Sequence, residues 1–124
     1  CGRMVNPLLV DGQVIGGLAA GIGNALLEES VYDERGQPLS ATLADYHVPG
    51  ASGIPEVRIV HMETPSPFSE FGMKGVGESG AIGPPAAIAN AINDALRPLG
   101  AEILETPMTP KRVLDAIRAA RLRA

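Results

Sequence analysis

Residues 73–80 read Met-Lys-Gly-Val-Gly-Glu-Ser-Gly, and this run is the most informative feature of the chain. Three glycines, a carboxylate and a hydroxyl fall within residues 75–80. Because glycine has no side chain, such a loop lets backbone N–H groups approach a ligand closely. Pro84 and Pro85 follow and fit the first turn of a helix, whose N-terminus carries partial positive charge. The run predicts a ligand-binding loop before a helix, with Glu78 as a candidate base.

An apolar face at helical spacing runs through residues 13–29, on Ile15, Leu18, Ile22 and Leu26. Asp11 is the predicted N-cap of this helix. Each glycine inside a helix costs roughly 1 kcal/mol relative to alanine. The predicted helix nevertheless contains Gly16, Gly17, Gly21 and Gly23. They indicate close approach of either a ligand or another helix, and the sequence leaves both open.

Two more helices are predicted after the loop. One continues from Pro84 until Pro98 and Gly100 end it, and the other starts at Thr109, an N-cap followed by proline. Alternating or β-rich patterns predict short strands at residues 30–32, 39–45, 57–62 and 101–105. The predicted fold class is α+β, with about three helices packed on one face of a small, mostly antiparallel sheet. The even composition predicts a single domain over residues 1–124.

The composition is that of a globular protein and narrows the classes of partner. The chain is 45% hydrophobic and 19% charged, and its net charge of −4 opposes binding to nucleic acid or an anionic membrane. No apolar run approaches the length of a membrane span, so no membrane partner is expected. One cysteine excludes an internal disulfide framework and fits a reducing compartment, so a cytoplasmic location is expected. The start at Cys1 indicates a fragment or a processed chain.

Few side chains carry a specific chemical signal. His47 and His61 lack the paired spacing of metal ligands, so no metal held by side chains is expected. Residues 75–80 are neither a P-loop nor a dinucleotide-binding fingerprint, because the Gly-Lys-Ser/Thr ending and a preceding buried strand are both missing. Lys74 is either a phosphate contact or an ordinary solvated lysine. Glu63 and Glu70 are interpreted as surface charges. The remaining candidates are Glu78 in the loop, and Gln13 and Asn24 on the glycine-rich helix.

Several segments match, in order, those of one known family. Residues 1–7 resemble its lead-in, residues 11–23 its glutamine- and glycine-rich helix, and residues 26–37 the next stretch. Residues 74–85 are close to the prokaryotic form of its signature, and residues 109–113 resemble its ending. Where the family helix has a second glutamine, this chain has Ala20. Over nearly its whole length the chain resembles the C-terminal part of the large, molybdopterin-binding subunit of the xanthine dehydrogenase/aldehyde oxidase/carbon monoxide dehydrogenase family.

The resemblance implies molybdenum hydroxylase chemistry on a small-molecule substrate. It implies that Glu78 is a general base that activates a molybdenum-bound hydroxyl for attack on an electrophilic carbon. It also implies a molybdenum–molybdopterin cofactor, expected as the cytosine dinucleotide form. The residues implied to bind this cofactor are Gln13, Lys74, Gly75, Val76, Gly77, Ser79 and Gly80.

The resemblance also implies partners. Iron–sulfur clusters and FAD are expected only on other subunits, and the remainder of the large subunit would complete the site, so the chain alone is expected to be inactive. One alternative is a non-catalytic remnant or interaction domain that keeps the fold without cofactor and self-associates through exposed apolar surface. Another is a module that binds an anion or nucleotide at the loop and the following helix N-terminus.

Overall fold

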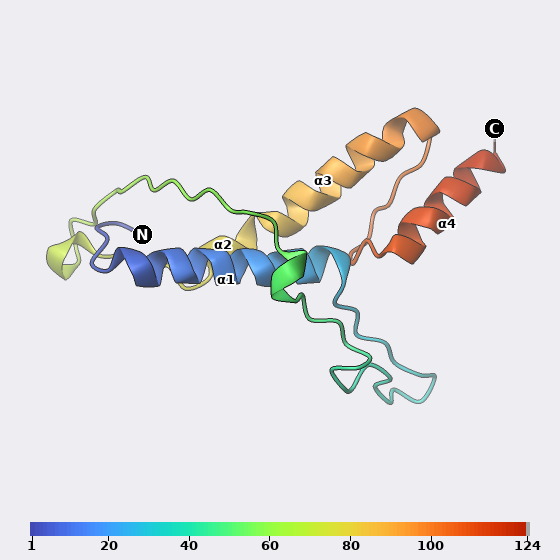
Figure 1. Cartoon of the computed structure of the whole chain (residues 1–124), viewed down its shortest axis with the longest axis horizontal. Coiled ribbons are helices and arrows are strands. Elements are labelled where there is room, and N and C mark those ends of the chain that lie inside the picture. Colours follow the sequence, from blue (N-terminus) through green and yellow to red (C-terminus); the bar gives the residue numbers. More distant parts are fainter. Residues whose placement is uncertain (124) are drawn as a thin grey trace.

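The computed structural model describes residues 1–123 and is helical (Figure 1). Three long helices, α1 (Pro7–Leu26), α3 (Pro84–Leu96) and α4 (Pro110–Arg121), are joined by the short helix α2 (Ser79–Ile82) and long irregular segments. Three 3₁₀ turns are present: η1 (Ala51–Gly53), η2 (Glu70–Gly72) and η3 (Arg97–Leu99). Figure 1 shows α1 as the long axis, with α3 and α4 extending beyond its C-terminal end.

The predicted α+β fold class is wrong. Within residues 1–123 there is no strand, only two isolated bridges, Gly2 with Met73 and Tyr32 with Pro38. All four predicted strands, at residues 30–32, 39–45, 57–62 and 101–105, are irregular backbone. Burial does alternate along residues 57–62, where Val57 and Ile59 are half-buried and Arg58 and Val60 are exposed. The alternation therefore shows only that one side of the segment is covered by the rest of the protein. A strand also needs a neighbouring strand that accepts and donates its backbone hydrogen bonds.

In residues 101–105 a side chain takes the place of the neighbouring strand as the hydrogen-bond partner of the backbone. Ala101 and Ile103 are buried while Glu102 is exposed, as in a strand. The pairing, however, comes from a helix side chain. The Asn93 amide on α3 donates to the Ile103 carbonyl and accepts from the Ile103 N–H, both at 2.9 Å. This amide satisfies both backbone groups of one residue, as a paired strand would.

The start of α1 was predicted too late. Its N-cap is Asn6, not Asp11, and the Asn6 Oδ1 accepts from the Leu9 N–H at 3.3 Å, with Pro7 at the first helical position. Asparagine and proline are favoured at these two positions. The predicted extension to Glu29 is also wrong, because the helix ends at Leu26. By length and composition α1 could cross a membrane, contrary to the prediction that no apolar run approaches that length, although the core helix of a globular protein can meet the same criteria.

The start of α3, the stop at Gly100 and the start of α4 are as predicted. Pro84 begins α3, η3 continues it, and Gly100 follows in the left-handed region at φ 65°. Thr109 caps α4 by accepting from the Arg112 N–H at 3.3 Å.

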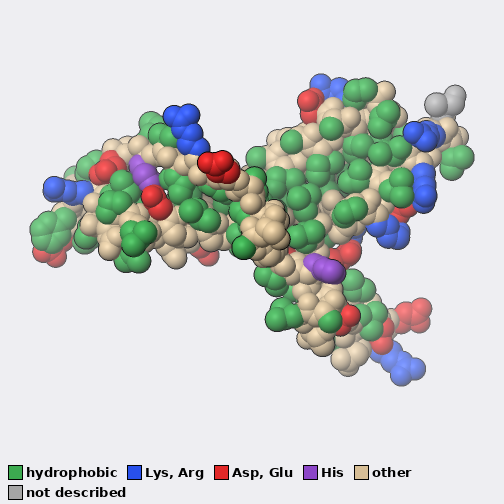
Figure 2. All heavy atoms as spheres, in the orientation of Figure 1, with side chains coloured by type: hydrophobic (Ala, Val, Ile, Leu, Met, Phe, Trp, Pro, Cys, Tyr) green, Lys and Arg blue, Asp and Glu red, His purple; other side chains and the backbone are tan. Residues whose placement is uncertain are grey.

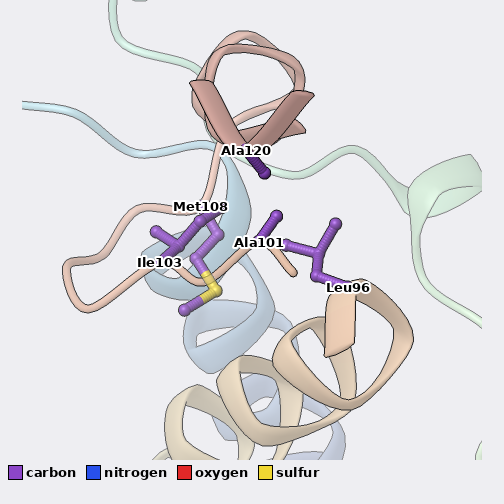
Figure 3. Close-up of a cluster of buried hydrophobic side chains, with 5 residues drawn as sticks. All are labelled: Leu96, Ala101, Ile103, Met108 and Ala120. Carbon is purple, nitrogen blue, oxygen red and sulfur yellow. The ribbon is translucent and has the colours of Figure 1, made fainter. Parts of the chain in front are cut away.

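The buried core lies where α3, α4 and the C-terminal end of α1 meet (Figure 3). Leu96, Ala101, Ile103, Met108 and Ala120 form it, and Leu26, Ile92 and Ile117 pack against it. The Met108 N–H donates to the Ala25 carbonyl, and Arg112 forms an ion pair with Glu29 at 2.6 Å, so α4 is tied to the end of α1. The core thus holds one end of α1 and leaves its N-terminal half for the glycine-rich loop.

Candidate functional site

The loop of residues 75–80 lies against the N-terminal half of α1, and its first end is held by the segment that precedes α1. Gly2 and Met73 form an isolated bridge. The Arg3 N–H donates to the Gly72 carbonyl at 3.0 Å, and the Lys74 N–H donates to the Cys1 carbonyl at 3.1 Å. Gly72 has a φ of 75°, which a glycine adopts without steric strain. The chain is therefore fixed immediately before Gly75.

The second end of the loop is held by backbone packed on backbone. A Cβ atom placed on Gly17 of α1 would lie 2.8 Å from the Gly80 Cα and 2.9 Å from the Ala81 nitrogen. One placed on Gly21 would lie 2.8 Å from the Pro84 Cβ. Both distances are too short for a real side chain, so Gly17 and Gly21 allow α2 and the start of α3 to touch α1. Close packing of helices therefore explains these two glycines, whereas a Cβ on Gly16 would meet nothing within 4 Å.

Between the two anchors the loop presents unused donors. Within residues 1–123, the N–H groups of Gly75, Val76, Gly77 and Glu78 donate to no protein acceptor. The Ser79 hydroxyl and N–H both turn back to the Val76 carbonyl, at 2.9 and 3.3 Å. Successive N–H groups in a turn form a concave site suited to anions and oxygen-rich ligands. The loop backbone can therefore bind such a ligand without losing an internal hydrogen bond.

Gln13 is brought to this loop from α1. Its Nε2 lies 3.8 Å from the position that a Cβ on Gly77 would occupy, and nothing else lies within 4 Å of that position. A Cβ on Gly75 would meet no atom within 4 Å. Gly75 and Gly77 therefore leave the loop backbone open to a ligand beside the Gln13 amide, and we call these three residues the cradle, whereas Gly80 is packed on α1.

Glu78 occupies the N-cap position of α2, with φ −105° and ψ −1°, but its side chain does not cap the helix. The residue is exposed, and within residues 1–123 its carboxylate makes no hydrogen bond and no ion pair. The Lys74 ammonium, by contrast, donates to the Thr64 hydroxyl at 3.0 Å. Among the loop residues, Glu78 is thus the charged group that is free to act on a bound molecule.

Three contacts beside the loop were missed by sequence reasoning. His61 Nε2 lies 2.6 Å from Asp11 Oδ1, the Glu63 Oε2 accepts from the Met4 N–H at 3.3 Å, and Thr64 holds Lys74. The first two join residues 50 and 59 positions apart. The sequence predicted an exposed or satisfied histidine at His61, without naming its partner, and a surface charge at Glu63. No local pattern links positions so distant, so the sequence held no signal for these pairs.

A family model, the molybdopterin cofactor-binding domain, matches residues 1–55. The chain is 44% identical over 118 residues to the nicotine 6-hydroxylase large subunit of Paenarthrobacter nicotinovorans. The matched region covers 95% of this chain and 14% of that subunit. It thus spans about one-seventh of the length of this relative.

Two solved structures have the same backbone arrangement. Quinoline 2-oxidoreductase from Pseudomonas putida 86 superimposes with a TM-score of 0.90 at 48% identity, over 95% of this chain and 15% of the other. Cu,Mo-CO dehydrogenase also gives a TM-score of 0.90, at 35% identity, over 100% of this chain and 16% of the other. The helical fold and the placement of the loop against α1 are therefore those of a segment within much larger chains.

Proposed function

This chain belongs to the family of molybdopterin-binding large subunits that includes xanthine dehydrogenase and carbon monoxide dehydrogenase, as a fragment from their C-terminal part, and on that premise we propose that it supplies the general base and part of the cofactor cradle of a molybdenum hydroxylase. The observation that carries the proposal is the loop itself. It is held at both ends and offers free N–H donors, and its single carboxylate, Glu78, has no partner within residues 1–123.

The residues present fit an anionic, oxygen-rich cofactor. The N–H groups of Gly75, Val76 and Gly77 have no protein acceptor within residues 1–123, and the Gln13 amide lies beside Gly77. We assign them to the cofactor. Lys74 adds positive charge at the first end of the loop, Ser79 shapes its turn, and Gly80 lets the turn lie directly on α1. The cytosine dinucleotide form is proposed because residues 74–85 resemble the prokaryotic signature.

When bound, the molybdenum–molybdopterin cofactor supplies the two-electron acceptor for oxidation of a small-molecule substrate. Glu78 takes a proton from the oxygen nucleophile, which requires its carboxylate to lie within hydrogen-bond reach of that oxygen. A carboxylate without a protein partner can make that contact without first breaking another. Relatives are named as subunits of larger complexes, and we place the iron–sulfur clusters and FAD on such partner subunits.

The proposal is tested in the complete enzyme by Glu78→Gln, which keeps the shape and removes the base. General-base catalysis contributes roughly 10²- to 10⁴-fold, so we expect kcat to fall by about that factor. The molybdenum content per large subunit should stay close to that of the parent enzyme.

The matched control is Glu70→Gln, which removes an exposed carboxylate in η2, outside the loop. Its turnover should equal that of the parent. Full turnover in Glu78→Gln would refute the assigned role. A loss of molybdenum in that variant would show that Glu78 serves cofactor binding and not proton transfer.

A further inference from the structure

Residues 61–64, which we call the strap, connect three separate parts of the site. His61 binds Asp11 on α1 at 2.6 Å, Glu63 accepts from the Met4 N–H at 3.3 Å, and Thr64 accepts from the Lys74 ammonium at 3.0 Å. In Figure 1 the strap belongs to the extended segment that returns along α1 toward its N-terminal end. Three of its four side chains thus each bind a different element.

Each of these elements bears on the candidate base or on the cradle. Asp11 lies two residues before Gln13 on α1, and Lys74 directly precedes Gly75. Met4 belongs to the N-terminal segment that holds residues 72–74. The strap therefore ties the helix that carries Gln13 to the first anchor of the Glu78 loop.

The chain that follows the strap reinforces the same anchor. The Ser66 N–H donates to the Gly72 carbonyl at 3.1 Å, and that carbonyl also accepts from Arg3. A Cβ placed on Gly72 would lie 2.8 Å from the Pro65 Cβ, so this part of the chain packs tightly on the anchor. The loop is thus held from two directions, by the N-terminal segment and by residues 61–66.

The His61–Asp11 contact is the most protected of the three. The His61 side chain is 24% exposed and that of Asp11 is 44% exposed. A hydrogen bond is electrostatically stronger where water is partly excluded. The returning segment first packs on α1 at Pro49, whose Cδ would lie 2.8 Å from a Cβ on Gly23, and the His61–Asp11 contact then holds it against the N-terminal half of α1.

We infer that the strap is a positioning element for Glu78, with His61 and Thr64 as the residues that set the distance between α1 and the first anchor of the loop. The inference rests on the proposed function of Glu78. The contacts of the strap are to Asp11, Met4 and Lys74, so we assign it an effect through the elements that it joins.

The test compares Thr64→Val, which removes the hydroxyl acceptor at nearly constant shape, with Thr64→Ser, which keeps it, in the complete enzyme. In Thr64→Val we expect the amides of Gly72, Met73 and Lys74 to exchange hydrogen about tenfold faster, which is the scale of one lost hydrogen bond. The rate of hydrogen exchange at the amides of α3 should not change. We expect kcat to fall by about the same factor, with KM and molybdenum content unchanged. Thr64→Ser should restore both exchange and kcat.

Three results would overturn the inference. They are unchanged amide exchange at residues 72–74 in Thr64→Val, faster amide exchange throughout α3 in the same variant, or a loss of kcat in Thr64→Ser equal to that in Thr64→Val. Asp11→Asn gives an independent variant of the strap, and it too should accelerate exchange at residues 72–74. Failure of the proposed function is separately visible, because Glu78→Gln would then keep its turnover while the exchange measurement still decides whether the strap holds the loop.

Discussion

At the residue scale, Gly17 and Gly16 are neighbours in α1 with opposite surroundings. A Cβ on Gly17 would lie within 3 Å of backbone atoms of Gly80 and Ala81, whereas one on Gly16 would meet nothing within 4 Å. Either change to alanine gains helix propensity of about 1 kcal/mol. Only Gly17→Ala forces α2 away from α1, and such overpacking costs typically 1–3 kcal/mol.

Gly17→Ala is therefore expected to be less stable than Gly16→Ala by about 1–3 kcal/mol, since the propensity gain is common to both. Denaturant unfolding of this chain, followed by helical circular dichroism, measures the difference. Equal stability of the two variants would contradict the close contact between Gly17 and Gly80.

The sequence pattern predicted a loop at residues 75–80 but not the contacts that hold this loop in place. Glycine density and the single carboxylate of residues 75–80 are local features, and they identified Glu78 and its neighbours as candidates. The glycines of α1 could be interpreted in two ways, and the structure assigns Gly17 and Gly21 to close packing. The pairing of Asp11 with His61 could not be predicted, because the geometry that joins them arises only when the chain returns along α1.

At the element scale, helices were easier to predict than strands for a physical reason. A helix satisfies its own backbone within four residues, so the start of α3 at Pro84 and the N-cap of α4 at Thr109 were correctly identified from local sequence. An extended segment needs a partner elsewhere. In residues 101–105 the pattern of burial is that of a strand, yet the partner is the Asn93 side chain.

Asn93→Ala should therefore destabilise the contact between α3 and residues 101–105. Both backbone groups of Ile103, a buried residue, lose their partner, and a buried unsatisfied group costs about 1–3 kcal/mol. The matched control is Asn90→Ala, one turn earlier and exposed, which should stay within about 0.5 kcal/mol of the parent. Urea unfolding of the three chains makes the comparison, and an Asn93→Ala midpoint equal to that of Asn90→Ala would contradict it.

At the scale of the whole molecule, the buried core lies at the C-terminal end of α1, and the candidate site lies on its N-terminal half. The core is small, and much of the apolar surface is exposed, including Leu8 at 80%, Met62 at 86% and Phe68 at 96%. Figure 2 shows hydrophobic side chains gathered over the face of α3 and α4. An apolar groove of about 450 Å³ also opens between α4 and the end of α1, lined by Leu27, Met108 and Leu114 among others.

Such surface predicts that the isolated chain self-associates. Size-exclusion chromatography with light scattering should give a mass above the 12.8 kDa of one chain, and the mass should rise with concentration. A monodisperse 12.8 kDa species at all concentrations would show that this surface does not drive association.

The central claim is that this sequence forms part of a molybdenum site. The most direct measurement is elemental analysis of the protein that contains it, purified from its native source under mild conditions, with the co-purifying chains identified by mass. We expect molybdenum in near-stoichiometric amount together with iron–sulfur and flavin subunits. A metal-free protein without partner chains would contradict the claim and leave the fold as a remnant that no longer holds cofactor.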